Sequence, residues 1–179
     1  RFYRFIFPEI TRMWKNMETG VIYARVSSKE QEVEGYSIPA QLKLLREYAQ
    51  KNNITIIREF TEVETAKKAG RTQFSEMLVF IKNNLRVKHL LAEKPDRLLR
   101  NTMDLALLEE LMNENGVKIH TVKDGKKYDA KSPSSEKFMF GIQGLMAKQV
   151  IENLSEEVVK VMREKAAQGT YPSRAPFGY

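Results

Sequence analysis

The sequence contains no cysteine, so disulfide bonds and thiolate metal sites are excluded, which fits an intracellular, cytoplasmic protein. Histidine is also scarce. His89 and His120 are the only two, which rules out a three-histidine zinc site, and no HExxH motif is present. No apolar run approaches the roughly 20 residues that a membrane helix needs. The GxxxxGK, GxGxxG and GxSxG motifs are missing as well, so neither a nucleotide-binding loop nor a hydrolase nucleophile elbow is indicated.

Charge is the first positive feature of the chain. Thirty Lys and Arg residues against 23 Asp and Glu residues give a formal net charge of +7. A basic balance favours an anionic partner such as nucleic acid. Residues 1–16 carry a large share of this excess, through Arg1, Arg4, Arg12 and Lys15 against Glu9. The remaining chain is only mildly basic, so charge alone does not identify the partner.

A length of 179 residues suits one compact domain with an additional segment. Residues 1–16 are aromatic and basic, and Met17 reads like a natural start, so we expect 1–16 to be a leader or an added extension. The alternative is an amphipathic arm that packs on the domain. We expect a main domain at 17–132, a long helix at 133–168, and a linker at 169–179 that opens a further domain.

Strand-like and helix-like segments alternate from residue 20 onward. Their order predicts an α/β fold with a mostly parallel sheet of four to five strands and helices on both faces. β-Branched and aromatic runs predict strands at 21–26, 54–57, 87–92 and 117–122. Apolar residues at helical spacing predict helices that begin after Ser37-Ile38-Pro39, over 74–81, and over 103–111. Ligands in such folds bind at the carboxyl ends of the strands, which points to the loops 27–37, 61–72 and 94–101.

The segment from Glu136 to Gln168 predicts one long helix, with apolar residues recurring about every four positions. A helix of about 30 residues spans some 45 Å, which exceeds the width of a small domain. We therefore expect its distal half to leave the domain and to pack on a partner subunit or lie along a ligand. The alternative is a helix that packs only on its own sheet.

Arginines beside strand ends are the residues that could carry chemistry. Arg25 lies two residues before Ser27 on the first strand, so the two side chains are expected on one face. Arg71 lies in the loop after the second strand. Asp96, Arg97 and Arg100 follow the third strand, and the two arginines share a face if that turn is helical.

Guanidinium groups gathered around one hydroxyl suit phosphate chemistry. Arginine remains charged, binds phosphate oxygens in a bidentate manner, and stabilises the additional charge of a pentacoordinate transition state. Such a site could work without a metal or another cofactor. Taken alone, Ser27 reads as a turn or cap residue, and Ser28 competes with it. Both histidines fall in predicted strands, where a structural role is expected.

Four ordered motifs resemble one family, the serine recombinases of the resolvase and invertase superfamily. YARVSSKEQ at 23–31 resembles the nucleophile motif, and EGYSIPAQ at 34–41 is similar to the segment that follows it in large members. AGRTQFSEML at 69–78 resembles the second arginine motif, and EKPDRLLRN at 93–101 resembles the DRLxR motif. SRAPFGY at 173–179 looks like the opening of the recombinase domain that follows in large members of mobile-element type.

The resemblance implies a resolvase-like catalytic domain in which Ser27 becomes linked to a DNA 5′-phosphate. Arg25, Arg71, Arg97 and Arg100 would contact the scissile phosphate, Asp96 would organise them, and Gln41 would support them. It also implies double-stranded DNA as partner, a homodimer that assembles into a tetramer on DNA through the long helix, and no metal or nucleotide. DNA contacts are expected from Lys160, Arg163 and Lys165 of that helix and from Arg174 beyond it.

The chain departs from the family within the long helix. Val150-Ile151 stand where many members have Glu-Arg, and Glu157 replaces another common arginine. Two other functions compete with recombination. One is a non-catalytic DNA-binding or assembly module on the same fold. The other is a metal-dependent nuclease or phosphatase, which needs several carboxylates at strand ends, where only Asp96 qualifies clearly. The general base remains open between water, a carboxylate such as Asp96, and a serine pKa lowered by arginines.

Overall fold

A five-stranded sheet forms the centre of the protein in the computed structural model, which describes residues 18–27, 37–64 and 71–169, with the backbone alone at 27, 64 and 147–156. Its strand order is β2-β1-β3-β4-β5. The strands are β1 (Glu18–Ser27), β2 (Ile54–Glu64), β3 (Val87–Ala92), β4 (Lys118–Thr121) and β5 (Lys126–Tyr128). The first four are parallel and β5 is antiparallel to β4, so the predicted mostly parallel sheet is confirmed.

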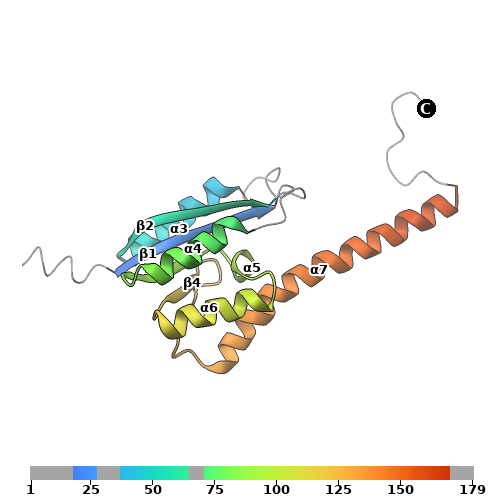
Figure 1. Ribbon diagram of the computed structural model, residues 1–179. Coiled ribbons are helices and arrows are strands. Elements are labelled where there is room, and N and C mark those ends of the chain that lie inside the picture. The colour runs from blue at the N-terminus through green and yellow to red at the C-terminus, as the bar shows by residue number, and fades with distance from the viewer. Residues whose placement is uncertain (1–17, 28–36, 65–70, 170–179) are drawn as a thin grey trace, which may run out of the picture.

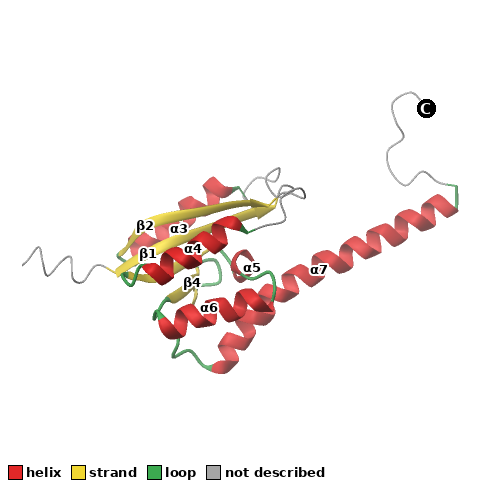
Figure 2. Cartoon of the chain, in the orientation of Figure 1, coloured by secondary structure: helices red, strands yellow, loops and turns green. Residues whose placement is uncertain are grey.

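Helices cover both faces of this sheet, as expected for alternating strands and helices (Figure 1, Figure 2). They are α3 (Ile38–Lys51), α4 (Thr72–Asn83), α5 (Pro95–Leu98), α6 (Thr102–Glu114) and α7 (Ser134–Ala167). Side chains alternate along β1, so Val21 and Tyr23 join the core beneath α4 and α6, while Ile22 packs under α3 with Leu45 and Leu91. Arg25 therefore continues the row of Val21 and Tyr23 toward the carboxyl end of the strand.

The ends of the elements follow from local residues. Ser37 occupies the N-cap position of α3 with Pro39 in the first turn, as the sequence predicts, although the Ser37 side chain makes no capping hydrogen bond. Gly116 has a positive φ of 65° and allows the turn from α6 into β4. Strands β1 and β2 are longer than predicted because they pair along their full lengths, up to Ser27 opposite Glu64.

Helix α7 begins on the domain and then departs from it. Its first turns pack against α5 and α6, where Gly144 and Gly141 permit a close approach. A Cβ added to Gly144 would lie 2.4 Å from Cβ of Leu99, so only glycine fits there. The distal half extends away from the sheet (Figure 1), and residues 157–169 are all exposed. Across the described ranges, no helix combines the length and the hydropathy that crossing a membrane requires.

The two histidines form a hydrogen-bonded chain within the α3 side of the sheet. His89 Nε2 lies 2.8 Å from Glu18 Oε2, and His89 Nδ1 lies 2.8 Å from His120 Nε2. His120 Nδ1 lies 3.0 Å from the Tyr48 hydroxyl. Since a carboxylate only accepts, a consistent set of donors has both imidazoles neutral with Nε2 protonated. The strand histidines thus have structural partners, far along β1 from Ser27.

The hydrogen bonds that link Glu18, His89, His120 and Tyr48 predict that the folded protein loses stability in acid. Burial, together with the neighbouring His89, Lys127 and Lys118, lowers the pKa of His120 from 6.5 to about 3, against a weaker opposing effect of Glu18. Between these values the unfolded state binds more protons, so the stabilisation present above the unfolded pKa is lost as pH falls toward 3. Urea denaturation of the wild type between pH 7.5 and pH 4 should show this slope. His120→Gln should show a shallower slope, and equal slopes in both proteins would contradict the assignment.

Candidate active site

Three parallel strands bring their carboxyl ends together at one edge of the sheet, because β1 lies between β2 and β3. Ser27 is the last residue of β1, and its side chain lies outside the described part. Arg25 precedes it by two positions. Its Nη2 donates to the carbonyl of Asp96, and its Nε donates to the carbonyl of Arg97 at 3.3 Å. The segment after β3 therefore holds the guanidinium group of Arg25 on β1. The sequence predicts that these segments converge.

Gln41 holds the backbone amide and carbonyl of Arg25. The residue lies in the first turn of α3 and is 1% exposed. Its Nε2 donates to the Arg25 carbonyl at 3.0 Å, and its Oε1 accepts from the Arg25 amide at 3.3 Å. A buried amide satisfied in both directions holds the strand end in place. Gln41 is thus placed as a support for the site.

Arg71 reaches the same point from the opposite side. It precedes α4, and its Nη2 donates at 3.2 Å both to the Arg97 carbonyl and to the Tyr23 hydroxyl. Its Nη1 forms an ion pair with Asp104 Oδ2. Its guanidinium carbon lies 3.8 Å above the ring of Phe74. Two arginines of distant sequence positions, Arg25 and Arg71, therefore share one carbonyl acceptor.

A buried tyrosine and carboxylate lie behind Arg71. The Tyr23 hydroxyl is 3.4 Å from Glu62 Oε2, which also accepts from the Phe74 amide at 3.2 Å. Glu62 thereby caps the first turn of α4, whose own N-cap residue makes no side-chain capping bond. Burial raises the pKa of Tyr23 to about 12, although the Arg71 charge opposes the rise. Tyr23 therefore remains protonated and serves as a neutral hydrogen-bonding group.

Arg97 is enclosed by the protein, with 4% of its side chain exposed. Its Nη1 donates to the Arg25 carbonyl at 3.2 Å. Its Nε lies 3.7 Å from a carboxylate oxygen of Glu93 and 3.7 Å from one of Asp96. Glu93 is itself 3% exposed and accepts from Lys123 at 2.9 Å. The charge of Arg97 is thus balanced by a buried carboxylate that the sequence reasoning missed.

The expectation that Arg97 and Arg100 share a face depends on a helical turn that includes both residues. Helix α5 ends at Leu98, and Leu99 is extended, with φ −97° and ψ 129°. The turn is helical at Arg97 but not at Arg100, so helical spacing does not place the two arginines on one face. Arg100 is half-buried, and its amide donates to Asp104 Oδ2 at 2.9 Å. Proline at the first position of α5 starts this short helix, and the extended Leu99 ends it.

The sequence reasoning missed Tyr23, Glu62, Glu93 and Asp104. Asp104 had a local signal, since Asn101 caps α6 and Asp104 stands three residues later, as in a capping box. That signal predicts a helix start and does not reveal the contact with Arg71. Tyr23 and Glu62 lie on strands facing the core, where their side chains could only be assigned partners from the fold.

Other predicted contacts lie away from the arginine cluster. Lys160, Arg163 and Lys165 are exposed on the distal part of α7. Arg174 lies outside the described residues. Within the described ranges, no group of three His, Asp or Glu side chains could hold a metal ion. The structure therefore brings Arg25, Gln41, Arg71, Asp96, Arg97 and Arg100 to one edge of the sheet and leaves the basic residues of α7 apart from it.

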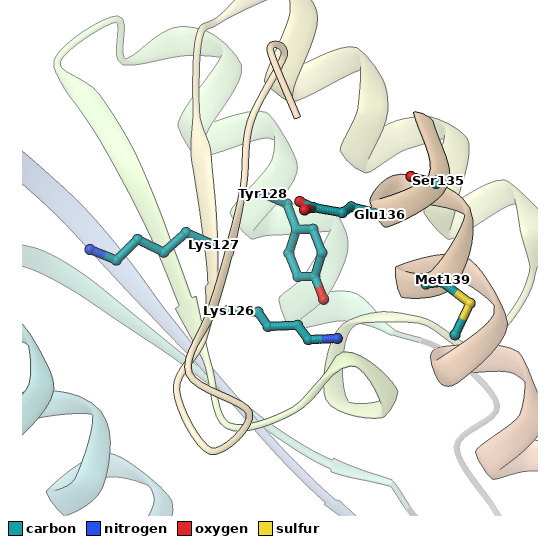
Figure 3. Close-up of a pocket in the computed structure, with 6 residues that line it drawn as sticks. All are labelled: Lys126, Lys127, Tyr128, Ser135, Glu136 and Met139. Carbon is teal, nitrogen blue, oxygen red and sulfur yellow. The ribbon is translucent and has the colours of Figure 1, made fainter. Parts of the chain in front are cut away.

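A separate pocket of about 320 Å³ lies between β5 and the start of α7 (Figure 3). It is lined by Lys126, Lys127, Tyr128, Ser135, Glu136 and Met139. The Lys127 side chain extends away from the Tyr128 ring, toward Asn52 at 3.4 Å. This pocket contains no arginine and lies at the edge strand β5, so it is distinct from the cluster around Arg25.

Comparisons with known proteins agree with this fold. A resolvase family site-specific recombinase from Streptococcus pneumoniae has a TM-score of 0.56 and 26% identity, over 83% of this chain and 98% of that one. The N-terminal catalytic domain of TP901-1 integrase has a TM-score of 0.54 and 21% identity, over 78% and 98%. The C-terminal catalytic domain of ISC1926 TnpA, an IS607-like serine recombinase, has a TM-score of 0.50 and 21% identity, over 80% and 84%.

No protein with a curated description matches the chain. The family model described as Resolvase, N terminal domain, matches residues 20–171, which is most of the sequence. The match begins within β1 and continues through the end of α7. The chain therefore belongs to the resolvase N-terminal domain family.

Proposed function

We propose that this chain is the catalytic domain of a site-specific DNA recombinase of mobile-element type, with Ser27 as the nucleophile. The observation that carries the proposal is the convergence of Arg25 and Arg71 on the Arg97 carbonyl, at the end of the strand that Ser27 closes. Held guanidinium groups at a strand end form a ready site for a phosphodiester. The family relationship and the similar fold of known recombinases support the same assignment.

The reaction would be a transesterification. The Ser27 hydroxyl loses its proton as Oγ forms a bond to the scissile phosphorus. The bond from phosphorus to the 3′-oxygen breaks, and the 3′-oxygen takes up a proton and leaves as a hydroxyl, so the step is proton-neutral. The product is a 5′-phosphoserine, whose ester bond retains the energy needed for rejoining. A 3′-hydroxyl of the exchanged strand then attacks that phosphorus and releases Ser27.

The arginines would stabilise the charge that develops on the pentacoordinate phosphorus. Arg25, Arg71 and Arg100 would line the site from three segments, and the buried Arg97 would support it by donating to the carbonyl of Arg25. Contact between Arg97 and a phosphate would require the site to open, since this side chain is 4% exposed. Asp96 would organise the cluster through its carbonyl and its carboxylate, and Gln41 would hold the strand end. The guanidinium groups that face the phosphate would stabilise its developing charge, as a metal ion does in other phosphoryl transferases, so the proposed reaction would need no cofactor.

Assembly would use α7. Val158, Val161 and Met162 on its distal half are 44–51% exposed, which suits contact with a partner subunit. DNA phosphates would be contacted by basic residues that lie among these apolar ones in the sequence, Lys160, Arg163 and Lys165, and by Arg174. A homodimer that assembles into a tetramer on double-stranded DNA would bring together four Ser27 nucleophiles, one for each DNA strand of two duplexes. Phosphate contacts of this kind position the protein without specifying the sequence.

The test is covalent capture on DNA in the presence of EDTA. The full-length protein is incubated with a nicked duplex that carries the recombination site, so that the cleaved strand diffuses away and the protein–DNA ester accumulates. We expect a covalent adduct that resists denaturant. Cleavage that requires added magnesium would instead support a metal-dependent nuclease, and DNA binding without any adduct would support a non-catalytic assembly module.

A further inference from the structure

We infer that Asp104 is a positioning residue that holds Arg71 and the backbone of Arg100 in the arginine cluster. The inference rests on the proposed function, because it assigns a role within that same site. One oxygen of Asp104, Oδ2, accepts from Arg71 Nη1 and from the Arg100 amide. The side chains of Asp104 and Arg71 are each 10% exposed. A single carboxylate oxygen thus joins two segments that carry predicted phosphate ligands.

Helix α6 fixes the position of this carboxylate. Asp104 stands in the first turn of α6, and its amide donates to the Asn101 side chain at 2.9 Å. A negative charge there is favoured by the partial positive charge at the helix N-terminus. Leu108 and Leu111 of the same helix are fully buried in the core beneath the sheet. Arg71 is therefore tied to a rigid element rather than to a loop.

The other partners of Arg71 cannot replace Asp104. The Tyr23 hydroxyl and the Arg97 carbonyl are neutral acceptors at 3.2 Å. Glu62 lies behind Tyr23 and is engaged by the Phe74 amide. Asp104 is the carboxylate that contacts the Arg71 guanidinium directly. Charge-assisted hydrogen bonds are stronger and more directional than neutral ones, so the orientation of Arg71 depends most on Asp104.

Asp96, the acid that the sequence predicts to organise the arginines, makes weaker contacts with them through its side chain. Its carboxylate lies 3.7 Å from Arg97 Nε and is 26% exposed. Its contact with Arg25 uses the main-chain carbonyl, which any residue at that position would provide. Asp96 and Asp104 thus contact different arginines, and of these two acids Asp104 is the one that contacts Arg71.

The experiment compares Asp104→Asn with Leu111→Val. The first variant removes the negative charge, so the hydrogen bond from Arg71 loses its charge assistance. The second removes a buried methylene group from the same helix and leaves both Asp104 and its partner Asn101 in place, so it controls for loss of helix stability. We measure the single-turnover rate of adduct formation, the affinity for the same DNA, and the heteronuclear NOE of the Arg71 Nε–H group in the protein without DNA.

Asp104→Asn is expected to slow adduct formation roughly 10- to 100-fold, as small misplacements of catalytic groups do, without a change in DNA affinity. Leu111→Val should keep the wild-type rate even if its melting temperature falls by as much as that of Asp104→Asn. Asp104→Glu, which retains the carboxylate, should recover part of the rate. The Arg71 NOE should fall in Asp104→Asn and remain high in Leu111→Val.

The inference is overturned if Asp104→Asn reacts at the wild-type rate, or if Leu111→Val slows the reaction equally. A wild-type protein that forms no adduct would refute the proposed function instead. In that case the Arg71 NOE still decides whether Asp104 holds Arg71, since it requires neither DNA nor turnover. Equal NOE values in wild type and Asp104→Asn would then overturn the inference.

Discussion

Ser27→Ala is expected to abolish the covalent adduct, with a loss of at least about a thousandfold in the rate of DNA cleavage. Alanine removes the hydroxyl that would bond to phosphorus and leaves the backbone of β1 unchanged. The side chain lost is small and lies at the end of a strand, so folding should be retained. The measurement is denaturing electrophoresis of protein incubated with the nicked duplex, where the adduct migrates as a larger species.

Ser28→Ala is the matched control for this variant. It removes the same group one position along the chain, where strand alternation predicts the opposite face from Arg25. We expect this variant to retain most of the adduct. If Ser28→Ala loses the adduct and Ser27→Ala keeps it, the nucleophile has been assigned to the wrong serine. DNA affinity should be close to that of the wild type in both variants.

Arg71→Ala is expected to lower the rate of adduct formation by roughly 10²- to 10³-fold, the range typical of losing one donor to a developing oxyanion. The variant also leaves the Asp104 carboxylate without its guanidinium in a nearly buried site, so some loss of thermal stability should accompany it. Arg71→Lys should recover little activity, because an ammonium group cannot span Asp104, Tyr23 and the Arg97 carbonyl at once.

Arg58→Ala controls for the general loss of an arginine. The Arg58 guanidinium also lies over aromatic rings, 4.7 Å from the centroid of Phe60 and 5.1 Å from that of Phe80, but on β2 away from the cluster. We expect its rate of adduct formation to match that of the wild type. A comparable slowing in Arg58→Ala would mean that net charge, rather than a placed guanidinium, determines the rate.

Much of the fold could be predicted from local patterns. The run Val87–Ala92 forms β3 with the expected bounds, because a short β-branched and apolar segment buried on both faces has few alternatives. Helix ends followed from Ser37 with Pro39 and from Gly116. Strand β5 was not located, since Lys126–Tyr128 carries two lysines and depends on pairing with β4 rather than on its own composition.

From the sequence, the candidate site could be predicted only as a group of residues that follow neighbouring strands. Arg25, Arg71 and Arg97 meet there because the strand order β2-β1-β3 brings their loops together. The acids that hold them are set by packing. Asp104 lies 33 residues from Arg71 in the sequence, and Glu62 lies 39 from Tyr23. No local spacing encodes such contacts, so the sequence points to Asp96, which lies in the recognisable motif, and gives no indication of Asp104, which contacts Arg71.

Peptide mapping of the trapped adduct by mass spectrometry tests the central claim most directly. Adduct formed in EDTA is digested with protease and nuclease, and the peptide that carries the residual 5′-nucleotide is sequenced by fragmentation. We expect the added mass on Ser27, within the peptide that ends β1. A nucleotide on Ser28 or on any other side chain, or a protein that cleaves DNA and yields no modified peptide, would contradict the proposed nucleophile and mechanism.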